Sequence, residues 1–576
     1  MAEGTRPHGG GWIAAAVAGL AWVLLCLRWF DAAASFRPRA LGLVPPWLLA
    51  ALLVAALALS ARRSLRAPPP EARVGRRDPR LLMAVAAAVL FRLPLAVQGG
   101  AAYVTADGAL SGLMALDVRD GRAHPVFVPH VPYSGSLKAH LTAPLAAVMD
   151  GARAFALVSL AFYAAFVAAL VRLADAASPS RPLVPLAAGL YAAFAPPFVT
   201  RYSLSNDGNY VEVLALGTWA MVLALRAADE RVAGARRAVV MGLLLGLAFW
   251  CHILAVIPAA AVVAFLVLES PRATARALPR VALGFALGDL PGLLWNAGNA
   301  WDSLAYLRPG AVGGGATQGT ARSLLHKAWA MASDQLPVLL GYDFGYPRAV
   351  DRALAAVAVL AALAALIGIV CALRRSRGEA GRPWRLLLVL TATDLAVALL
   401  ALPYIPGNPR YLLFLMASVP VFIAQALAGR RARVLLAFLV AVGAASSLAQ
   451  GAGTIAADGH WRSFVRGLEE GGVRWCYTDF FLATRINFLS DERITCSAKL
   501  GPTTTEYFFR FREAVEAAPE AALIAVNASA ADKLARRLDR LGVGYRRQEL
   551  MKPVLLSLSR KVDPQELFPD RAFPLR

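Results

Sequence analysis

Long apolar stretches separated by short polar loops fill the first 450 residues of the chain. A run of about 20 predominantly apolar residues is long enough to cross the hydrocarbon core of a bilayer as one helix. Thirteen stretches come near that length: 11–29, 43–60, 81–97, 153–171, 183–199, 210–226, 238–251, 254–269, 281–297, 351–373, 385–402, 411–428 and 433–449. The seventh and eighth are short, and Pro258 favours half-helices or one bent element there. The pattern therefore predicts an α-helical polytopic membrane protein with twelve or thirteen transmembrane helices.

The pattern changes after residue 450. Strand-like segments alternate with helical ones, and the strand-like segments are 473–478, 493–497, 522–526 and 554–559. Ser529 with Asp532 three residues later is typical of a helix start, and Gly542 of the end of that helix. About 120 residues are enough to bury a core of their own. We therefore predict a transmembrane domain, 1–450, and a small α/β domain outside the membrane, 451–576.

Composition supports this class of protein. Of the 576 residues, 58% are hydrophobic and only 17% are charged, which is too apolar for a water-soluble protein of this length. The segment 11–30 has no small-residue cleavage site and leads into a second apolar stretch, so it is interpreted as an anchor rather than a cleavable signal. These features predict a multi-pass protein of the cell (inner) membrane.

The formal net charge of +22 is concentrated in loops between the apolar stretches. Five loops are rich in arginine: Arg62, Arg63, Arg66, Arg73, Arg76, Arg77 and Arg80; Arg231, Arg236 and Arg237; Arg272, Arg276 and Arg280; Arg374, Arg375, Arg377, Arg382 and Arg385; and Arg430, Arg431 and Arg433. Thirteen spans would put all five loops on one side, which the positive-inside rule makes cytoplasmic. The arginines would then contact anionic membrane lipids, which argues against nucleic acid as a partner.

This orientation places the N-terminus in the cytoplasm. It places the tail after residue 450 on the periplasmic or extracellular side, together with the loops 98–152, 200–209, 298–350 and 403–410. Cys476 and Cys496 lie on two strand-like segments of that tail, twenty residues apart. An oxidising compartment favours a disulfide between them if the two strands are close neighbours in one sheet. Two buried free thiols are the alternative, because the sequence does not define the order of the strands.

Candidate chemistry concentrates in the loop 98–152. Asp107 lies just past the end of the third apolar stretch, and the dozen residues after it look helical and half apolar. A second helical stretch carries apolar side chains along one face, at Leu137, Leu141, Leu145 and Val148. Lys138 and His140 lie off that face, and Tyr133 belongs to the Pro- and aromatic-rich segment between the two helices. Both helices are predicted to lie in the plane of the membrane interface.

A series of short motifs runs from Asp107 into the later loops. GLMAL at 112–116, DG at 120–121, HPVF at 124–127 and YSGSLKAHLTAP at 133–144 follow Asp107; GLLLGLAFWCH at 242–252, LPGLLWNAGN at 290–299 and NPRYLLFLMASVP at 408–420 come later. The pattern resembles the GT-C glycosyltransferase superfamily. Within it, the pattern is most similar to the bacterial branch near protein mannosyltransferases and lipid A aminoarabinose transferases, the family-39 and Rgt-type membrane enzymes. The resemblance covers most of residues 80–430.

The resemblance implies a donor and a base. Nucleotide sugars are not expected outside the membrane, so the enzyme would take a sugar from a polyprenyl phosphate and pass it to a glycan, lipid or protein acceptor. Asp107 would be the general base, although it can also serve as a helix N-cap or dipole partner. The phosphate would be bound by cations at loop–span junctions, and the candidates are Lys138, Arg92, Arg201 and Arg410. Each arginine has an alternative role as an interface anchor, and Tyr133 and His140 are further candidates for substrate binding.

One position departs from the family pattern. Many relatives carry Asp-Glu where this chain has Asp107 and Gly108, so no role of that glutamate is carried over. Asp207 or Glu212, in the next outer loop, can substitute for it. No histidine spacing matches a metal-ligand pair, so no metal-binding residues are predicted. A requirement for a divalent metal ion stays open, and no other cofactor is predicted.

Ionisable residues inside the apolar stretches support other interpretations. Asp289 and Asp394 lie deep in their stretches, and a proton relay through them would indicate a transporter or flippase of lipid-linked substrates. Hydrogen bonds to neighbouring helices are the alternative for both aspartates and for His252, which lies at a helix reversal. A non-catalytic scaffold that presents the tail domain is a further alternative. The two halves of the chain show no repeat, which argues against the transporter.

Overall fold

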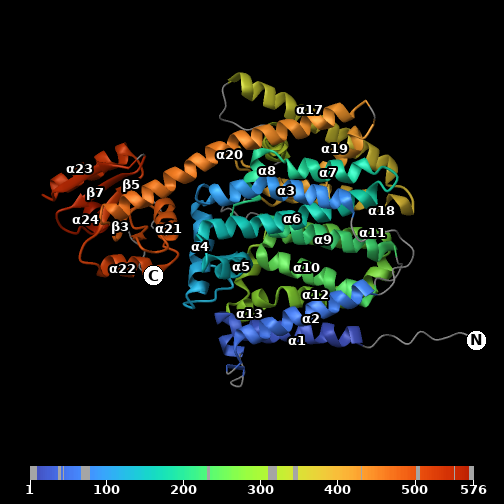
Figure 1. Ribbon diagram of the computed structural model, residues 1–576, viewed down its shortest axis with the longest axis horizontal. Coiled ribbons are helices and arrows are strands. Elements are labelled where there is room, and N and C mark those ends of the chain that lie inside the picture. Colours follow the sequence, from blue (N-terminus) through green and yellow to red (C-terminus); the bar gives the residue numbers. More distant parts are fainter. Residues whose placement is uncertain are drawn as a thin grey trace, which may run out of the picture.

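The computed structural model describes residues 10–36, 41–42, 44–66, 78–205, 207–229, 234–308, 321–341, 348–429, 431–500, 506–550 and 552–569. Long helices lie side by side in the main body, and a small domain with a β-sheet lies beyond one end of them (Figure 1). The start of the first helix and the sheet domain lie at opposite ends of this helical body.

The helical body accounts for most of the chain. Its longer helices are α1 (Gly10–Trp29), α2 (Pro46–Arg66), α3 (Pro79–Gln98), α6 (Gly151–Ala177), α7 (Leu183–Ala193), α9 (Tyr210–Asp229), α10 (Ala235–Cys251), α11 (Val256–Glu269), α12 (Pro271–Gly288), α17 (Arg348–Arg375), α18 (Arg382–Leu400) and α20 (Arg433–Glu470). The elements between them are η1 (Asp31–Phe36), η3 (Gly100–Tyr103), α4 (Ala106–Arg119), β1 (Phe127–Val128), β2 (Val131–Gly135), α5 (Leu137–Ala146), α8 (Pro197–Tyr202), η4 (Ile253–Ala255), α13 (Leu290–Gly298), α14 (Asp302–Ala305), α15 (Ala321–Ala330), η5 (Met331–Gln335), α16 (Leu336–Leu340), η6 (Glu379–Gly381), η7 (Arg410–Ala417) and α19 (Val419–Leu427).

Six helices in the described part of the chain are long and apolar enough to cross a membrane unbroken: α3, α6, α9, α17, α18 and α20. The count rises to eight if two bent pairs are each one span: α12 with α13, bent by 73°, and η7 with α19, bent by 48°. The helical membrane class is therefore confirmed, whereas the number twelve or thirteen stays a prediction. The difference arises because several apolar stretches form shorter helices; the stretch 183–199, for example, breaks between α7 and α8.

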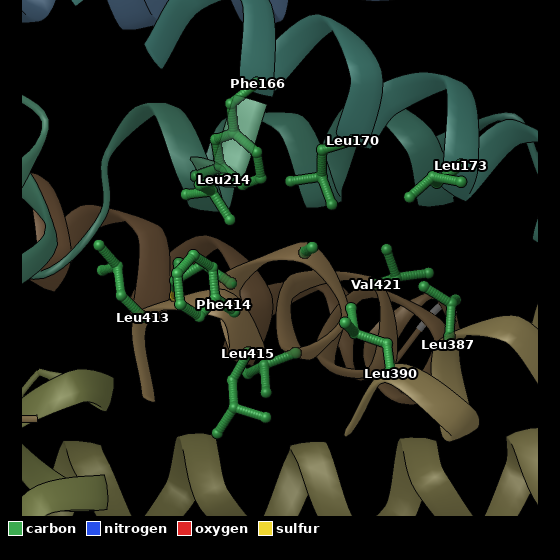
Figure 2. Packing of buried hydrophobic residues seen from close by; sticks show 14 of the residues in the cluster. Phe166, Leu170, Leu173, Leu214, Leu387, Leu390, Leu413, Phe414, Leu415 and Val421 are labelled. Atoms are coloured by element: carbon green, nitrogen blue, oxygen red, sulfur yellow. The ribbon is translucent and has the colours of Figure 1, made fainter. Parts of the chain in front are cut away.

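A tightly packed apolar core joins the middle helices of the body. Phe166 and Leu170 of α6 face Leu390 of α18, and Phe414 of η7 and Val421 of α19 fill the space between these helices (Figure 2). Each of these five side chains is at most 2% exposed. A bent pair such as η7 and α19 leaves backbone groups outside a regular helix, and such backbone is tolerated at membrane depth where protein surrounds it.

Two glycine pairs bring α10 and α12 into backbone contact. A Cβ atom added at Gly246 would lie 2.1 Å from the carbonyl oxygen of Phe285, and one added at Gly284 would lie 2.0 Å from that of Val239. Gly242 and Gly288 are equally close to the opposite backbone. Small residues four apart on two facing helices allow this approach, which favours helix association in a bilayer.

Helix α20 leaves the helical body and leads into the sheet domain (Figure 1). It has 38 residues, so the predicted end of the last apolar stretch at 449 lies inside it, and the first strand of the sheet begins only at Trp475. The sheet has the order β4-β3-β5-β7-β6. Its elements are β3 (Trp475–Tyr477), α21 (Phe480–Leu489), β4 (Thr495–Ser497), α22 (Phe509–Ala517), β5 (Ala522–Ala525), α23 (Ala528–Arg540), β6 (Tyr545–Glu549), β7 (Val554–Leu558) and α24 (Pro564–Leu567). Strands β4, β3 and β5 are parallel, and β7 pairs antiparallel with β5 and β6.

Two details of this domain differ from the sequence prediction. Helix α23 starts earlier than predicted, because the side chain of Asn527, not that of Ser529, accepts the backbone N–H of Ala530 and caps the helix. Its end agrees with the prediction, since Gly542 follows it with a left-handed φ of 63°. Strand β6 was not predicted, because its residues are almost all exposed and polar at the edge of the sheet.

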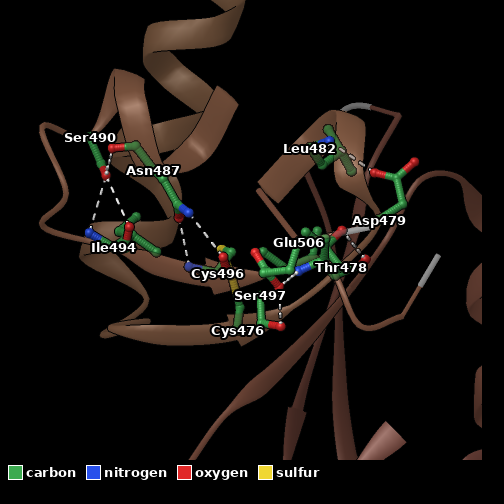
Figure 3. Close-up of a disulfide and its surroundings, with 12 residues drawn as sticks. Cys476, Thr478, Asp479, Leu482, Asn487, Ser490, Ile494, Cys496, Ser497 and Glu506 are labelled. Carbon is green, nitrogen blue, oxygen red and sulfur yellow. Dashed lines mark hydrogen bonds between the residues drawn. A yellow bond between two sulfur atoms is a disulfide. The ribbon is translucent and has the colours of Figure 1, made fainter. Parts of the chain in front are cut away.

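The disulfide between Cys476 and Cys496 is confirmed (Figure 3). The two residues lie directly opposite each other on the parallel neighbours β3 and β4, with 4.4 Å between their Cα atoms. Asn487 of α21 supports the pair, because its side chain bonds to the backbone N–H and carbonyl of Cys496. The bond lies in the buried core of the domain and closes a loop that contains α21.

Candidate functional site

Helix α4 carries Asp107 across the end of the helical body that faces the sheet domain (Figure 1). Thr105 caps the helix by accepting the backbone N–H of Gly108, so Asp107 is not the cap but lies in the first turn. The rest of α4 from Ala106 to Val118 is buried, and Asp107 alone in that stretch is exposed. The predicted lipid-facing side is instead covered by the sheet domain, whose Phe488 would clash with any side chain at Gly112. Helix α5 has the exposed apolar side that an interfacial helix needs, since Leu141, and Val148 just past its end, are exposed while Lys138, off that face, is buried. Its position in the membrane interface stays a prediction.

A cavity of about 180 Å³ opens beside Asp107. It is lined by Asp107, Leu110, Ser111, Val128, Val131, Tyr133, Ser134, Asp207, Gly208, Tyr210, His252, Arg410, Tyr411 and Tyr507. These residues come from α4, the hairpin β1–β2, the α8–α9 loop, the start of α9, the α10–η4 junction, the start of η7 and the sheet domain. Segments far apart in the sequence therefore meet at one site, as in most enzyme pockets.

Close backbone packing fixes the hairpin that forms one wall. A Cβ atom at Gly135 would lie 2.0 Å from the carbonyl oxygen of Trp250, so only glycine fits between β2 and α10. The side-chain amide of Asn209 lies within hydrogen-bond distance of the carbonyls of Gly135 and Cys251. The hairpin, α10 and the start of α9 are thus tied together behind the cavity.

The electrostatic environment of Asp107 suits a proton acceptor. Although the side chain of Asp107 is exposed to the cavity, the surrounding walls partly desolvate its carboxyl group and raise its pKa; the like charge of Asp207 raises the pKa further, and the positive charge of Arg410 opposes both. A carboxylate with a raised pKa holds a proton more readily than an ordinary surface aspartate. It is therefore a stronger general base, provided that it remains ionised at the working pH.

Arg410 provides positive charge in this cavity. It begins η7 and donates a hydrogen bond to the hydroxyl of its neighbour Tyr411, at 3.1 Å. Its Nε is buried and meets no acceptor within the described residues, and no carboxylate there lies within ion-pair distance of its guanidinium. Donor capacity without a protein partner is what a phosphate ligand would use.

Asp207 and Arg201 are brought together at the rim of the cavity. Their side chains form an ion pair with 3.2 Å between Nη2 and Oδ2, and the hydroxyl of Thr105 donates to the other carboxylate oxygen. Because Thr105 also caps α4, this contact links Asp207 to the helix of Asp107. The structure therefore places both predicted residues near the site, with the charge of Arg201 partly neutralised by Asp207.

Lys138 and Glu212 were predicted to bind substrate, and the structure places them elsewhere. They form an ion pair of 2.8 Å, with side chains only 1% and 0% exposed, and neither lines the cavity. Lys138 also lies within 3.4 Å of acceptors on Ser159 and Ser205. Each charge is already paired inside the protein, so substrate binding by Lys138 and Glu212 stays a prediction that this geometry does not support.

Arg92 and His140 are also structural. Arg92 is fully buried and donates to Ser203 and to the carbonyls of Ala192 and Ala193, so it supports the break between α7 and α8. The ring of His140 accepts from Trp29 Nε1 and donates to the carbonyl of Pro125, and burial lowers its pKa to about 4. A neutral histidine held at both nitrogens joins α1 to the loop and has no free atom for a substrate.

Of the other candidates, Tyr133 lines the cavity as predicted for a binding residue, and burial raises its pKa to about 12. The sequence interpretation missed several wall residues: Ser111, Ser134, Tyr210, His252, Tyr411 and Tyr507. For His252 the sequence predicts a hydrogen bond to a neighbouring helix, and Tyr411 follows Arg410 in the motif NPRYLLFLMASVP. Nothing in the sequence pointed to Tyr507, because it comes from the sheet domain.

Asp107 and Asp207 are the two carboxylates that line the cavity. The described residues contain no group of three His, Cys, Asp or Glu side chains that could hold a metal ion. Two carboxylates alone supply fewer ligands than a protein-held divalent cation usually has. The described residues therefore do not fit a resident metal, and no chemical step below uses one. Asp289 and Asp394 do not line the cavity.

No protein-family model matches the chain, and no curated protein does. Solved structures do. The crystal structure of ArnT from Cupriavidus metallidurans bound to undecaprenyl phosphate aligns with a TM-score of 0.55 at 10% identity, over 83% of this chain and 97% of that one. The apo state of that protein aligns with 0.53 at 12% identity, over 82% and 98%. The oligosaccharyltransferase of Archaeoglobus fulgidus in complex with Zn and sulfate aligns with 0.45 at 12% identity, over 84% and 73%.

The likeness to ArnT extends over nearly the whole length of that protein and over more than four fifths of this chain. At this level of identity it establishes the architecture alone. ArnT is a GT-C glycosyltransferase. The chain therefore has the GT-C fold, with a mostly helical membrane body and a small C-terminal sheet domain.

Proposed function

We propose that this protein is a membrane glycosyltransferase that moves a sugar from a polyprenyl-phosphate donor to an acceptor hydroxyl at the outer face of the cytoplasmic membrane. One observation carries the proposal. A carboxylate with a raised pKa, Asp107, and a cation that has no carboxylate partner among the described residues, Arg410, share one cavity at the end of the helical body nearest the sheet domain. The ArnT structure with the same fold contains undecaprenyl phosphate, which supports a lipid-linked donor.

The chemistry needs a base but no acid. The acceptor oxygen attacks the anomeric carbon, and the bond from that carbon to the phosphate oxygen breaks, so the lipid phosphate leaves with the electron pair. Asp107 takes the proton of the attacking hydroxyl. Attack on the face opposite the leaving group inverts the anomeric centre. Because phosphate is a good leaving group at neutral pH, positive charge is sufficient to stabilise its departure.

Arg410 would perform that second task. It stands at the start of a bent pair of apolar helices, where a lipid headgroup can approach from the membrane while its tail stays in hydrocarbon. Its guanidinium would donate to the phosphate oxygens in the ground state and more strongly as negative charge develops on the bridging oxygen. Arg201 and Asp207 would shape the rim beside it.

The proposed location of the cavity, outside the cytoplasm, rests on the charge distribution among the loops. Arginine-rich loops define the cytoplasmic side, and the sheet domain, residues 451–576 in the proposed division, would lie outside with the cavity beneath it. The acceptor class is considered further below.

The experiment begins with lipids from a strain that lacks this gene. Its polyprenyl-phosphate fraction should contain unconsumed sugar conjugate, and adding that fraction to purified protein with membranes of the same strain should release polyprenyl phosphate. The same sugar on a nucleotide and on a polyprenyl diphosphate are the comparison donors. The proposal would be contradicted if neither lipid-linked sugar were consumed, or if the nucleotide sugar were the preferred donor.

A further inference from the structure

The sheet domain contributes one described residue, Tyr507, to the wall of the cavity. Tyr507 is half-buried, and the negative charge of Asp107 is among the causes that raise its pKa. The phenol and the carboxylate therefore lie near each other, although they belong to different domains.

Aromatic contacts hold the ring of Tyr507 from both domains. His130 packs edge-on to it with 5.8 Å between ring centroids, and Phe480 of α21 packs against it at 5.2 Å. His130 occupies the turn between β1 and β2 with a left-handed φ of 59°. The hairpin that lines the cavity thus also supports Tyr507.

The residues on either side of Tyr507 are fixed as well. The carboxyl group of Glu506 accepts hydrogen bonds from the hydroxyl of Ser497 and the backbone N–H of Ala498, at 2.8 and 2.9 Å. Three residues later, Arg510 bonds to Asp117 of α4 at 2.8 Å and to Glu492 at 2.6 Å. Asp117 belongs to the helix that carries Asp107, so Tyr507 is held in register with the proposed base.

Two parts of the cavity have different origins. Arg410 and Tyr411 come from a bent helix pair of the membrane body, where a lipid phosphate would enter. Tyr507 comes from the domain outside the body, and Tyr133 and Tyr306 pack against each other nearby at 4.7 Å. Aromatic faces beside hydroxyl groups, such as that of Ser111, suit a ligand with an apolar C–H face and several hydroxyls.

A sugar ring has that chemistry. Resting on the proposed glycosyl transfer, we propose that Tyr507 forms the acceptor subsite and that the acceptor is a sugar ring whose hydroxyl is presented to Asp107. The sheet domain then completes the site by recognising the acceptor, while the membrane body binds the donor. A serine or threonine of a protein acceptor would leave the aromatic wall without a stacking partner.

The test separates acceptor from donor. The variants Tyr507→Ala and Tyr507→Phe are compared with the wild type and with Tyr545→Ala, a tyrosine of the same domain outside the cavity. Two quantities are measured with the full-length protein: the Kd for polyprenyl phosphate, and the transfer of radiolabelled sugar to membranes of the deletion strain. Label is then assigned to protease-resistant glycan or to protein.

Tyr507→Ala should lower transfer about 30-fold, the effect of losing an aromatic anchor of the acceptor, while the Kd for polyprenyl phosphate changes less than about 2-fold. Tyr507→Phe should retain most transfer, and the label should resist protease. An unchanged transfer rate, a parallel loss of lipid binding, or protease-sensitive label would overturn the inference. If the wild type neither bound polyprenyl phosphate nor transferred sugar, the proposed function itself would fail instead.

Discussion

Lys138 and Arg410 are both cations near the end of the helical body that faces the sheet domain, and the chain uses them differently. Lys138 points into the protein and meets Glu212 at 2.8 Å, with both side chains at most 1% exposed. Arg410 points into a cavity of about 180 Å³, shares it with Asp107, and has no carboxylate partner within the described residues. We call Lys138 with Glu212 the closed pair, because both charges are paired inside the protein, and Arg410 with Asp107 the open site, because a ligand can reach both side chains.

A charged side chain at a helix–loop junction can therefore serve either the stability of the fold or the binding of a ligand. Lys138 interacts with Glu212 inside the protein, so this ion pair stabilises the fold and is not available to a ligand. Removing either partner would leave the other as an unpaired buried charge. Arg410 forms no ion pair with a carboxylate of the described residues, so its donors can serve a ligand, although the cavity walls partly desolvate its charge. The residues of the open site should therefore affect turnover, and those of the closed pair should affect stability.

The largest expected effect is at the open site. Replacing Asp107 with Asn removes the proposed base and should lower kcat by about 10³- to 10⁴-fold with an unchanged melting temperature. Turnover of the wild type should fall as the pH drops through the raised pKa of Asp107, and Asp207→Asn should move that fall to lower pH because it removes a like charge. Asp120→Asn, on the same loop but outside the cavity, is the control. Full turnover by the Asp107 variant would exclude it as the base.

The closed pair should behave in the opposite way. Lys138→Met leaves Glu212 as a buried unpaired charge and should destabilise the protein by about 3–5 kcal/mol. The double variant Lys138→Met with Glu212→Leu should recover most of that loss, because two apolar side chains of similar size replace the ion pair. Thermal unfolding and the turnover per folded molecule are the measurements. If the double variant were stable but inactive, Glu212 or Lys138 would have a role in the reaction after all.

The sequence predicted the elements better than the directions of side chains. Every apolar stretch named from the sequence falls on one helix or on two consecutive helices, since hydrophobic runs of membrane length admit few other structures. Of the predicted site residues, Asp107, Tyr133 and Arg410 line the cavity, whereas Lys138 does not, although it also lies just past a predicted helix or loop boundary. Which way such a side chain points depends on helix phase and on the neighbours brought by distant segments. Tyr507 joins the site only through the docking of the sheet domain, which no local pattern encodes.

A smaller effect is expected at Arg410. Arg410→Gln should raise the Kd for polyprenyl phosphate by about 10- to 100-fold, the range expected for losing a charge-assisted hydrogen bond worth about 1.5–3 kcal/mol. Arg201→Gln should have a weaker effect, because the guanidinium of Arg201 already bonds to Asp207. Binding isotherms with polyprenyl phosphate at two salt concentrations provide the measurement. If both substitutions raised the Kd equally, the ion pair with Asp207 would not weaken phosphate binding by Arg201 relative to Arg410.

Glu506 is a third kind of charged side chain, a largely buried carboxyl group to which no cation of the described residues bonds. Burial raises its pKa to about 7, although the hydrogen bonds from Ser497 and Ala498 act in the other direction. Because the folded protein then holds the proton more tightly than the unfolded chain, this group stabilises the fold below its ordinary pKa and loses that contribution as the pH rises toward 7. After discounting for partial exposure we expect a loss of about 1–2 kcal/mol between pH 5 and pH 7.5. Glu506→Gln should flatten the dependence of the melting temperature on pH over this interval, with Glu513→Gln of α22 as the control. The opposite result would be a wild-type melting temperature that rises between pH 5 and pH 7.5, with the rise abolished by Glu506→Gln. That result would mean that the fold stabilises the ionised carboxylate of Glu506, so its surroundings would be more polar than its contacts indicate.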